Sequence, residues 1–396
     1  MGAGRNGLGF AVLLAVVVGL AVASGWELLV NVVYLLVGVL ALGLVWGRVG
    51  LAGLELTRRP SADRLQVGEE LVERFTLRSR GPLPLLPLEL RDGSTLPGRE
   101  RLRVLAVPPF GGGAWTVRTL CRQRGAYTLG PTELATSDPF GCFRARRVLA
   151  THRSLLVLPA TEPLPRFLPG GRDLPGGAVT QPTGRHDAAQ SSSVRDYVPG
   201  DPLSRIHWPS TARSGRLIVK QLEHEPTADV WIALDMHAVP QRGLGEGSTE
   251  EAAVRAAASV ARRFVEAGRA VGLWAQGDRA VALSPDRGEA QLGRLLEELA
   301  TLRAHGALPF DELLAGGEAR PSRGALLIAI TPSIEADWPD ALVEAGRGGR
   351  PIAILVEPST FGGRESSLVT IGRLAAGGVP TYLVKRAVPL GETLVA

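Results

Sequence analysis

Lysine and cysteine are scarce in this sequence. Lysine occurs only as Lys220 and Lys385, and cysteine only as Cys121 and Cys142. Two cysteines exclude a disulfide-stapled fold, and we expect both to be free thiols in a reducing compartment. The net charge of +5 therefore comes from arginine. The arginines are scattered singly, with no polybasic block and no aromatic platform between them, so the sequence argues against a nucleic-acid partner.

Signature motifs of catalysis are also missing. The sequence has no Gly-x-Ser-x-Gly elbow, no glycine-rich phosphate loop and no paired metal-ligand histidines. A histidine base remains conceivable at His207, with Asp196 to orient it, and at His237 beside Asp235. We therefore expect a non-enzymatic protein, and the alternative is a metal-dependent hydrolase that uses Asp235 and these histidines.

Two long apolar runs stand at the N-terminus. A helix crosses the hydrocarbon core of a bilayer with roughly 20 apolar residues. Residues 1–50 are predicted to form a two-helix transmembrane hairpin with spans at about 7–24 and 28–46, and Trp26 in the short turn lies at the interface. A cleaved signal peptide is the alternative for the first span.

Arginines flank this hairpin on one side only. Arg5 precedes the first span and Arg48, Arg58 and Arg59 follow the second, whereas the turn carries only Glu27. The positive-inside tendency then places both termini in the cytoplasm of a multi-pass protein of the cell membrane, in contact with the lipid bilayer.

Residues 55–158 have the pattern of short strands. Alternating runs at 71–79, 101–107 and 115–121 are separated by Gly-Pro, Asp-Gly and triple-glycine breaks. This pattern predicts an all-β, immunoglobulin-like sandwich that ends in the turn at 137–141. One small arginine cluster, which we interpret as a solvated strand end, comprises Arg144, Arg146 and Arg147.

After a Pro/Gly/Ser-rich linker at 159–193, residues 227–396 alternate between strands and helices. This alternation predicts an α/β domain with a mainly parallel sheet. The expected strands lie at 230–236, 270–276, 325–331, 351–356 and 379–384, and the expected helices at 248–268, 288–304, 335–346 and 365–376. Ligand sites of such domains follow the carboxyl ends of strands, which points to Asp235-Met236-His237.

Residues 194–226 form a polar strap between the two apolar regions. Asp201-Pro202 has the form of a helix start, so we expect a helical piece over 202–207, which Trp208 leaves because Pro209 follows. Residues 217–223 then alternate as a strand that can run beside 230–236.

Two interpretations of the strap stay open. The first is a structural clasp, in which acids and arginines bond one another: Arg195, Asp196, Asp201, Arg205, Arg213 and Glu223. The second is a docking face anchored by Tyr197, Trp208 and nearby arginines, because these residue types dominate interface energetics. The candidate interaction residues are Arg195, Asp196, Tyr197, Pro199, Gly200, Asp201, Arg205, His207, Trp208, Arg213, Gly215 and Lys220.

These features together resemble the bacterial family called "domain of unknown function 58". The resemblance rests on the double span, the Asp-Pro-Phe-Gly turn at 138–141, the Arg-x-Tyr-x-Pro-Gly-Asp stretch at 195–201 and a strand ending in Asp235. It implies a von Willebrand factor A-like, Rossmann-type domain at 227–396. It brings no settled activity, but it implies a MoxR-type AAA+ ATPase and a transglutaminase-like membrane protein as partners. We therefore expect a cytoplasmic adaptor that works with them in the assembly or maturation of an envelope-associated system.

The sequence departs from the family at two places. Family members carry Ile-Asp-Trp-Lys where this chain has Ile206-His207-Trp208-Pro209. A magnesium site of a von Willebrand A domain uses Asp-x-Ser-x-Ser, whereas only Asp235 of that pattern is present here, with Thr331, Ser333 and Asp337 as the remaining oxygens. We therefore expect no cofactor, and Asp235 and Thr331 are the candidate ligands if magnesium does bind.

Overall fold

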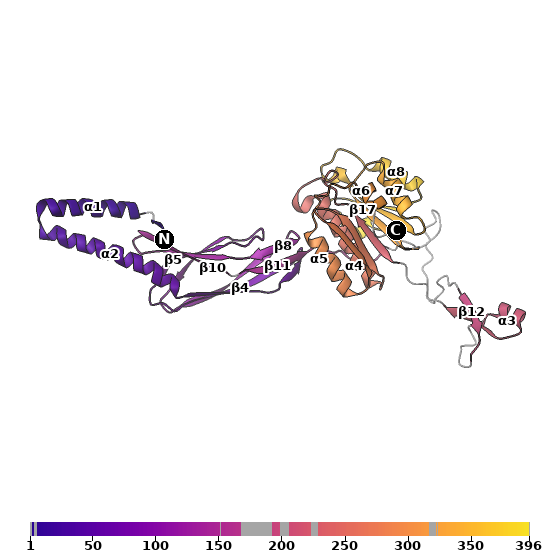
Figure 1. Ribbon diagram of the computed structural model, residues 1–396, viewed down its shortest axis with the longest axis horizontal. Helices are drawn as coiled ribbons and strands as arrows, with labels where there is room; N and C mark the ends of the chain where they lie inside the picture. The colour runs from indigo at the N-terminus through magenta and orange to yellow at the C-terminus, as the bar shows by residue number, and fades with distance from the viewer. Residues whose placement is uncertain are drawn as a thin grey trace. The chain divides into compact units, whose positions relative to one another are not determined.

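The computed structural model describes residues 2–3, 6–150, 152–167, 192–198, 206–222, 229–316, 322 and 324–395. Contacts divide the chain into two compact units, Met1–Ala160 and Thr161–Ala396. We call them the β-rich unit and the α/β unit (Figure 1).

The β-rich unit begins with two helices, α1 (Gly7–Ser24) and α2 (Glu27–Ala52). Both are long and apolar enough to cross a membrane. Gly25, with a φ of 64°, allows the left-handed turn that ends α1. α2 continues past the predicted limit of the second span and packs against strand β10 (Phe143–Leu149).

The remainder of the β-rich unit consists of strands in three sheets, in the orders β1-β10-β9-β5-β6, β2-β4-β7 and β3-β11-β8. Together with β10, the strands are β1 (Gly2–Ala3), β2 (Leu54–Pro60), β3 (Arg64–Gln66), β4 (Glu70–Ser79), β5 (Leu85–Asp92), β6 (Leu102–Val107), β7 (Gly112–Leu120), β8 (Gly125–Leu129), β9 (Thr132–Ser137) and β11 (Arg153–Leu158). The expected β-rich architecture is confirmed. Leu77 of β4, Leu88 of β5 and Leu134 of β9 share one buried cluster, so sheets pack face to face as a sandwich.

The α/β unit is built on a six-stranded sheet in the order β16-β15-β14-β17-β18-β19, with β16 antiparallel and the other strands parallel. Its strands are β14 (Val230–Leu234), β15 (Val271–Gln276), β16 (Ala280–Asp286), β17 (Leu326–Thr331), β18 (Arg350–Val356) and β19 (Thr381–Val384). Its helices are α4 (Thr249–Glu266), α5 (Glu289–Thr301), α6 (Phe310–Gly316), α7 (Trp338–Ala345), α8 (Leu368–Ala376) and α9 (Leu390–Thr393), with 3-10 turns at Gly245–Gly247 and Pro358–Phe361.

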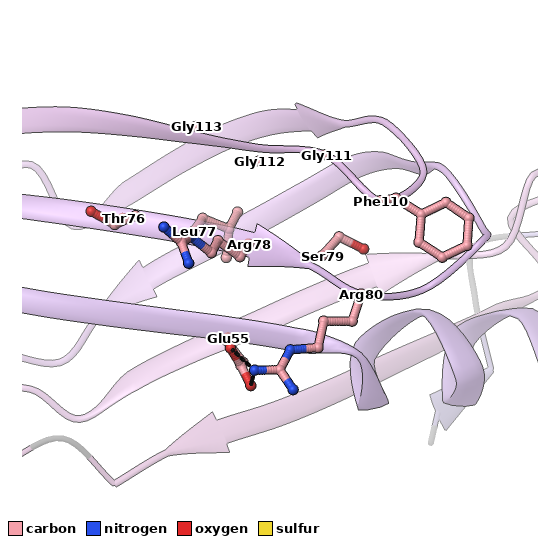
Figure 2. A pocket seen from close by; sticks show the side chains of 10 residues that line it. All are labelled: Glu55, Thr76, Leu77, Arg78, Ser79, Arg80, Phe110, Gly111, Gly112 and Gly113. Atoms are coloured by element: carbon pink, nitrogen blue, oxygen red, sulfur yellow. Dashed lines mark hydrogen bonds and ion pairs between the residues drawn. The ribbon is translucent and has the colours of Figure 1, made fainter.

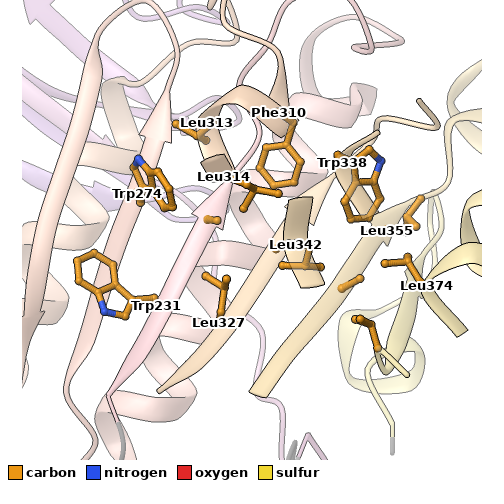
Figure 3. Close-up of a cluster of buried hydrophobic side chains, with 14 of the residues drawn as sticks. Trp231, Trp274, Phe310, Leu313, Leu314, Leu327, Trp338, Leu342, Leu355 and Leu374 are labelled. Atoms are coloured by element: carbon orange, nitrogen blue, oxygen red, sulfur yellow. The ribbon is translucent and has the colours of Figure 1, made fainter. Parts of the chain in front are cut away.

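The side chains of the central strand β14 point alternately to the two faces of this sheet. Trp231 and Ala233 join a cluster with Phe310 of α6, Trp338 of α7 and Leu374 of α8 (Figure 3). α4 contacts β14, β15, β17 and β18. Because every residue of β14 is buried, the strand is a continuous apolar run without alternation.

Several elements of the α/β unit were not predicted, among them β16, α6 and the short helix α9. β16 follows β15 after a short turn, and α6 is a helix of 7 residues. β16 lies at a sheet edge with an exposed-to-buried alternation, and α6 is too short for a clear helical period. The segment Thr161–Phe167, expected to be linker, packs here too: Phe167 makes edge-on contacts with Phe264 and Tyr382.

Candidate functional site

The strap folds into two short strands and one short helix, which we call the strap module (192–198 and 206–222). Strands β12 (Ser192–Asp196) and β13 (Ile218–Leu222) pair antiparallel, and α3 (Trp208–Ser214) precedes β13. The Thr211 hydroxyl of α3 accepts the first N–H of β13 at 3.0 Å. Gly215 ends the helix with a φ of 70°, a conformation that favours glycine.

The expected course of the helix is wrong at Trp208. This residue begins α3, and Pro209 lies in the first turn. Proline fits there because the first N–H groups of a helix have no helical partner in any case. The expected helical piece over 202–207 lies for the most part outside the described residues.

The expected pairing of 217–223 with 230–236 is also wrong. β13 pairs with β12, and its Val219 forms a further bridge with Ile206. Both edges of β14 are already occupied by β15 and β17, so no edge remains for β13.

The strap module contains one described ion pair of the kind that the clasp interpretation requires. Arg216 Nη1 lies 3.6 Å from Asp196 Oδ2, and both side chains are exposed. The Tyr197 N–H donates to the Leu217 carbonyl at 2.8 Å, and Arg213 is exposed. The backbone alone is described for Arg195 and Lys220, and the candidate residues outside the described part of the chain are Pro199, Gly200, Asp201, Arg205 and Glu223.

His207 is engaged within its own turn. Its Nδ1 lies 2.7 Å from the Ser210 hydroxyl, and its N–H donates to the Ile218 carbonyl at 2.7 Å. Asp196, expected to orient this imidazole, instead faces Arg216. Among the described residues, His207 therefore has a local structural contact with Ser210 and none with an acid.

Apolar side chains of the strap module face solvent. Trp208 is 65% exposed, Val198 56% and Leu217 43%. An exposed tryptophan on a short, internally bonded module is unusual for a side chain that gains so much free energy from burial. Such a residue is a candidate anchor for a partner.

A second polar site lies at the carboxyl edge of the six-stranded sheet, where the chain switches from one side of β14 to the other. Asp235 follows β14, and Thr331 ends the neighbouring β17. The Thr331 hydroxyl donates to Asp235 Oδ2 at 2.5 Å, and the His237 N–H donates to Oδ1 at 2.9 Å. Thr331 Oγ1 also accepts the Ser333 N–H at 2.8 Å.

Burial changes the acidity of this carboxylate. Asp235 is 1% exposed. Loss of solvation raises the pKa of Asp235 from 3.8 to about 6, although the hydrogen bonds from Thr331 and His237 favour the charged form. Ligands of α/β sheets bind at such switch points, so a carboxylate with a perturbed pKa marks this edge as a candidate site.

The oxygens available for a metal at this edge are few. Both Asp235 oxygens already accept hydrogen bonds from protein groups. Ser333 lies close by, whereas Asp337 is exposed at the start of α7. In the described part of the chain, no group of three or more His, Cys, Asp or Glu residues has the geometry to hold a metal ion.

A hollow of about 450 Å³ opens on the β-rich unit beside Phe110 (Figure 2). Its carboxylate, Glu55, forms an ion pair of 2.8 Å with Arg80, and both side chains are exposed. This is the chemistry of a solvated surface, without a base or a nucleophile positioned for catalysis.

A buried charge cluster inside the β-rich unit was not predicted. We call it the charge quartet, and it comprises Arg58, Glu73, Asp92 and Arg99. Arg58 Nε lies 2.6 Å from Glu73 Oε1, and Arg99 Nη2 lies 2.8 Å from Asp92 Oδ2. Arg58 also contacts Asp92 at 3.3 Å, and Arg99 contacts Glu73. Arg58 therefore does not contribute a solvated charge beside the membrane spans.

The two cysteines are buried and unbridged. Burial raises the pKa of the Cys121 thiol and that of the Cys142 thiol. A thiol held protonated is a poor nucleophile, so neither cysteine has the environment of a catalytic one.

Comparisons with known proteins match the segment that carries both candidate sites. The model of a family described as "Protein of unknown function DUF58" matches residues 193–375. This segment includes Asp235, Thr331 and all of the strap module except Ser192. The "Uncharacterized protein YeaD" of Bacillus subtilis (strain 168) is 24% identical over 334 residues, which cover 82% of this chain and 81% of that protein.

Solved structures give only faint similarity. The CARDB domain of the PF1109 protein from Pyrococcus furiosus, in complex with di-metal ions, is 11% identical over 26% of this chain and 87% of that chain, with a TM-score of 0.20. The complex of Zinc 2-glycoprotein and Prolactin inducible protein from human seminal plasma is 6% identical over 26% of this chain and 92% of that chain, with a TM-score of 0.21. At these scores we draw nothing from them about fold or metal.

Proposed function

We propose that this protein is a membrane-anchored adaptor that acts by binding other proteins. Its partner on this proposal is a MoxR-type AAA+ ATPase, together with a transglutaminase-like membrane protein, in the assembly or maturation of an envelope-associated system. The α/β unit is then a von Willebrand A-like domain. Its strand order supports this, because the sheet strands counted along the chain stand in the Rossmann-type order 3-2-1-4-5-6.

The observation that carries the proposal is the exposure of Trp208 within the family-matched segment. Tryptophan is enriched at the centres of interfaces, where a partner removes it from water. The first turn of α3 and the bond from Thr211 to β13 hold its backbone in place. A pre-organised anchor loses little entropy on binding.

We further propose that the adaptor needs no magnesium ion. Magnesium takes six oxygens in an octahedron; waters usually supply several of them, and one or two carboxylates with free lone pairs supply the charge. The buried carboxylate of the switch point is Asp235, with Glu335 near it, and Thr331 and the His237 N–H already bond both Asp235 oxygens. In this arrangement Asp235 orders the loop after β14.

The membrane orientation is part of the same proposal. α1 and α2 would cross the bilayer, with both units on the cytoplasmic side. Arg58 no longer supports this orientation because it is buried. Arg48, Arg146 and Arg147 support it instead, since they line one groove just beyond the apolar run of α2.

The test is crosslinking of the full-length protein in native membranes, followed by mass spectrometry. Trp208→Ala should lose most of the crosslinked AAA+ ATPase that the wild type retains. Trp26→Ala is a matched control, because Trp26 is 60% exposed but lies outside the family-matched segment. Equal recovery of the ATPase with the wild type and both variants would show that Trp208 is not part of the interface. Recovery of no ATPase with the wild type would contradict the adaptor function.

The alternative hydrolase has one observation in its favour, the raised pKa of Asp235. Against it, the side chain is inaccessible and its oxygens are occupied. Elemental analysis of the purified protein near zero for Mg, Mn and Zn, with no change on metal titration, would retire this alternative.

A further inference from the structure

At the end of α2, every fourth residue of the helix faces every second residue of strand β10. A Cβ placed on Gly43 would lie 3.2 Å from the Phe143 ring, and one placed on Gly47 would lie 2.9 Å from the Ala145 Cβ. Four helical residues rise about 6 Å and two strand residues about 6.6 Å, so successive contacts stay in step. Figure 1 shows the end of α2 beside the strands of the β-rich unit.

The next step of this register places Arg147 at the end of α2. Its Nη1 donates to the carbonyls of Leu51 at 2.8 Å, Ala52 at 3.2 Å and Leu54 at 3.2 Å. The last carbonyls of a helix have no partner within the helix and carry partial negative charge, so a guanidinium stabilises them. Arg147 is exposed, as the interpretation of the arginine cluster as a solvated strand end expects, and in addition it caps the end of α2.

A groove of about 560 Å³ lies between α2 and β10 at this level. Arg48 lines it from α2, and Arg146 and Arg147 line it from β10. Arg146 lies 3.6 Å from the Glu133 carboxylate, with most of its own side chain exposed. Three guanidinium groups thus line one groove, and the described residues that line it include no acid, so the groove is positive.

The depth of this groove follows from the apolar run of α2. The helix is apolar up to Trp46, and Arg48 follows two residues later. At a rise of about 1.5 Å per residue, Arg48 lies about 3 Å beyond the end of that run. The headgroup layer of a bilayer is roughly 5 to 8 Å thick on each side, so the groove falls within it.

We propose that this groove binds the phosphate headgroup of an anionic membrane lipid. The fork of an arginine bonds phosphate oxygens at two points, and Arg48 and Arg146 approach the groove from two different elements. The acyl chains remain beside the apolar run of α2. This site rests on the membrane anchoring proposed above, and it concerns the β-rich unit alone.

The experiment uses full-length protein in a neutral detergent, titrated with short-chain phosphatidylglycerol, short-chain phosphatidylcholine or inorganic phosphate. Bound lipid is counted by native mass spectrometry. The wild type should bind phosphatidylglycerol preferentially. The double variant Arg48→Gln with Arg146→Gln should weaken this binding about 25-fold, roughly fivefold for each guanidinium removed. Arg147 is left unchanged because it also caps α2.

The matched control is Arg118→Gln with Arg153→Gln, which removes two exposed arginines elsewhere in the β-rich unit. The control should bind like the wild type, and Arg48→Lys with Arg146→Lys should recover part of the affinity. Equal binding of both lipids, or equal weakening by both double variants, would overturn the site. Inorganic phosphate that binds as tightly as the lipid would make it a free-anion site and overturn the lipid assignment. Retention in membranes after an alkaline wash tests the anchoring separately.

Discussion

In the β-rich unit, Glu73 lies buried between the guanidinium groups of Arg58 and Arg99, whereas in the α/β unit Asp235 lies buried among neutral donors. Both carboxylates are nearly inaccessible to water. A buried charge is tolerated where an opposite charge compensates the lost solvation, as it does at Glu73. At Asp235 the two hydrogen bonds and the nearby His237 do not offset the lost solvation, so its pKa is raised.

This difference separates a structural acid from an acid at a candidate site. The charge quartet lies in the interior of the sandwich and fixes how its strands meet. Asp235 lies at the edge of a sheet, in the loop where ligands of this fold class bind. The strap module offers a third case, because Asp196 meets Arg216 in solvent. The three sites should respond to charge removal by very different amounts.

The largest effect is expected from Glu73→Gln in the charge quartet. The substitution leaves two buried arginines with one carboxylate, and breaking a buried pair in this way costs about 3 to 5 kcal/mol. Amide hydrogen exchange of the full-length protein should show loss of protection in β4 and β7, while β14 and β17 stay protected. Glu55→Gln, which removes one side of the exposed Glu55–Arg80 pair, is the control and should change stability by less than about 1 kcal/mol. Similar effects of both variants would contradict the structural role of the quartet.

The pH dependence of the α/β unit tests Asp235. Because its pKa rises from 3.8 to about 6 on folding, the folded state holds a proton between these values that the unfolded state releases. Stability should therefore fall as the pH rises from about 4 to 6, by roughly 3 kcal/mol from this group, and should stay level above. Exchange protection of β14 measured across this range should fall in the wild type, and Asp235→Asn should remove that part of the fall. Identical profiles for wild type and variant would show that Asp235 is not buried as described.

Thr331→Val tests how far hydrogen bonds stabilise the buried charge of Asp235. The substitution removes the hydroxyl and keeps the shape of the side chain. The Asp235 Oδ2 and the Ser333 N–H then lose a buried partner, which costs about 1 to 3 kcal/mol. The pKa of Asp235 should rise above its wild-type value, so the fall in stability should extend to higher pH. Thr381→Val, at a half-buried position of β19, is the control. A variant with the wild-type pH profile would exclude the Thr331 hydrogen bond as a support of the charge.

The smallest effect is expected from Asp196→Asn in the strap module. Its ion pair with Arg216 is exposed on both sides, and such pairs contribute less than about 1 kcal/mol. The free energy of opening that amide hydrogen exchange reports for β12 and β13 should differ from the wild type by less than about 1 kcal/mol. A larger loss of exchange protection in these strands would support the interpretation of the strap as a structural clasp.

Much of the fold could be predicted from pattern alone. The apolar runs of α1 and α2, the continuous β14 and the capped start of α4 at Ser248 carry periodic or local signals. The Ser248 hydroxyl does accept the Glu251 N–H at 3.2 Å, as the capping spacing predicts.

The candidate sites were harder to predict because their contacts join distant positions. Glu73 forms ion pairs with Arg58 and Arg99, which lie far from it in the sequence. No local spacing of residues predicts these contacts. Pro209 led to the wrong prediction that Trp208 leaves the helix, because proline occurs both in the first turn of a helix and just after its end. Asp235 and Thr331 were both named from the sequence, and the structure joins them although 96 positions separate them; that the contact is a hydrogen bond to a buried carboxylate was not predicted.

Oxidative footprinting of tryptophan in intact cells tests the adaptor most directly. In the purified protein, hydroxyl radicals should modify Trp208 readily, as its exposure requires. In cells, a bound partner should reduce its modification at least several-fold, while Trp208 regains full reactivity after purification. Equal modification of Trp208 in cells and in purified protein would contradict an interface at the strap module.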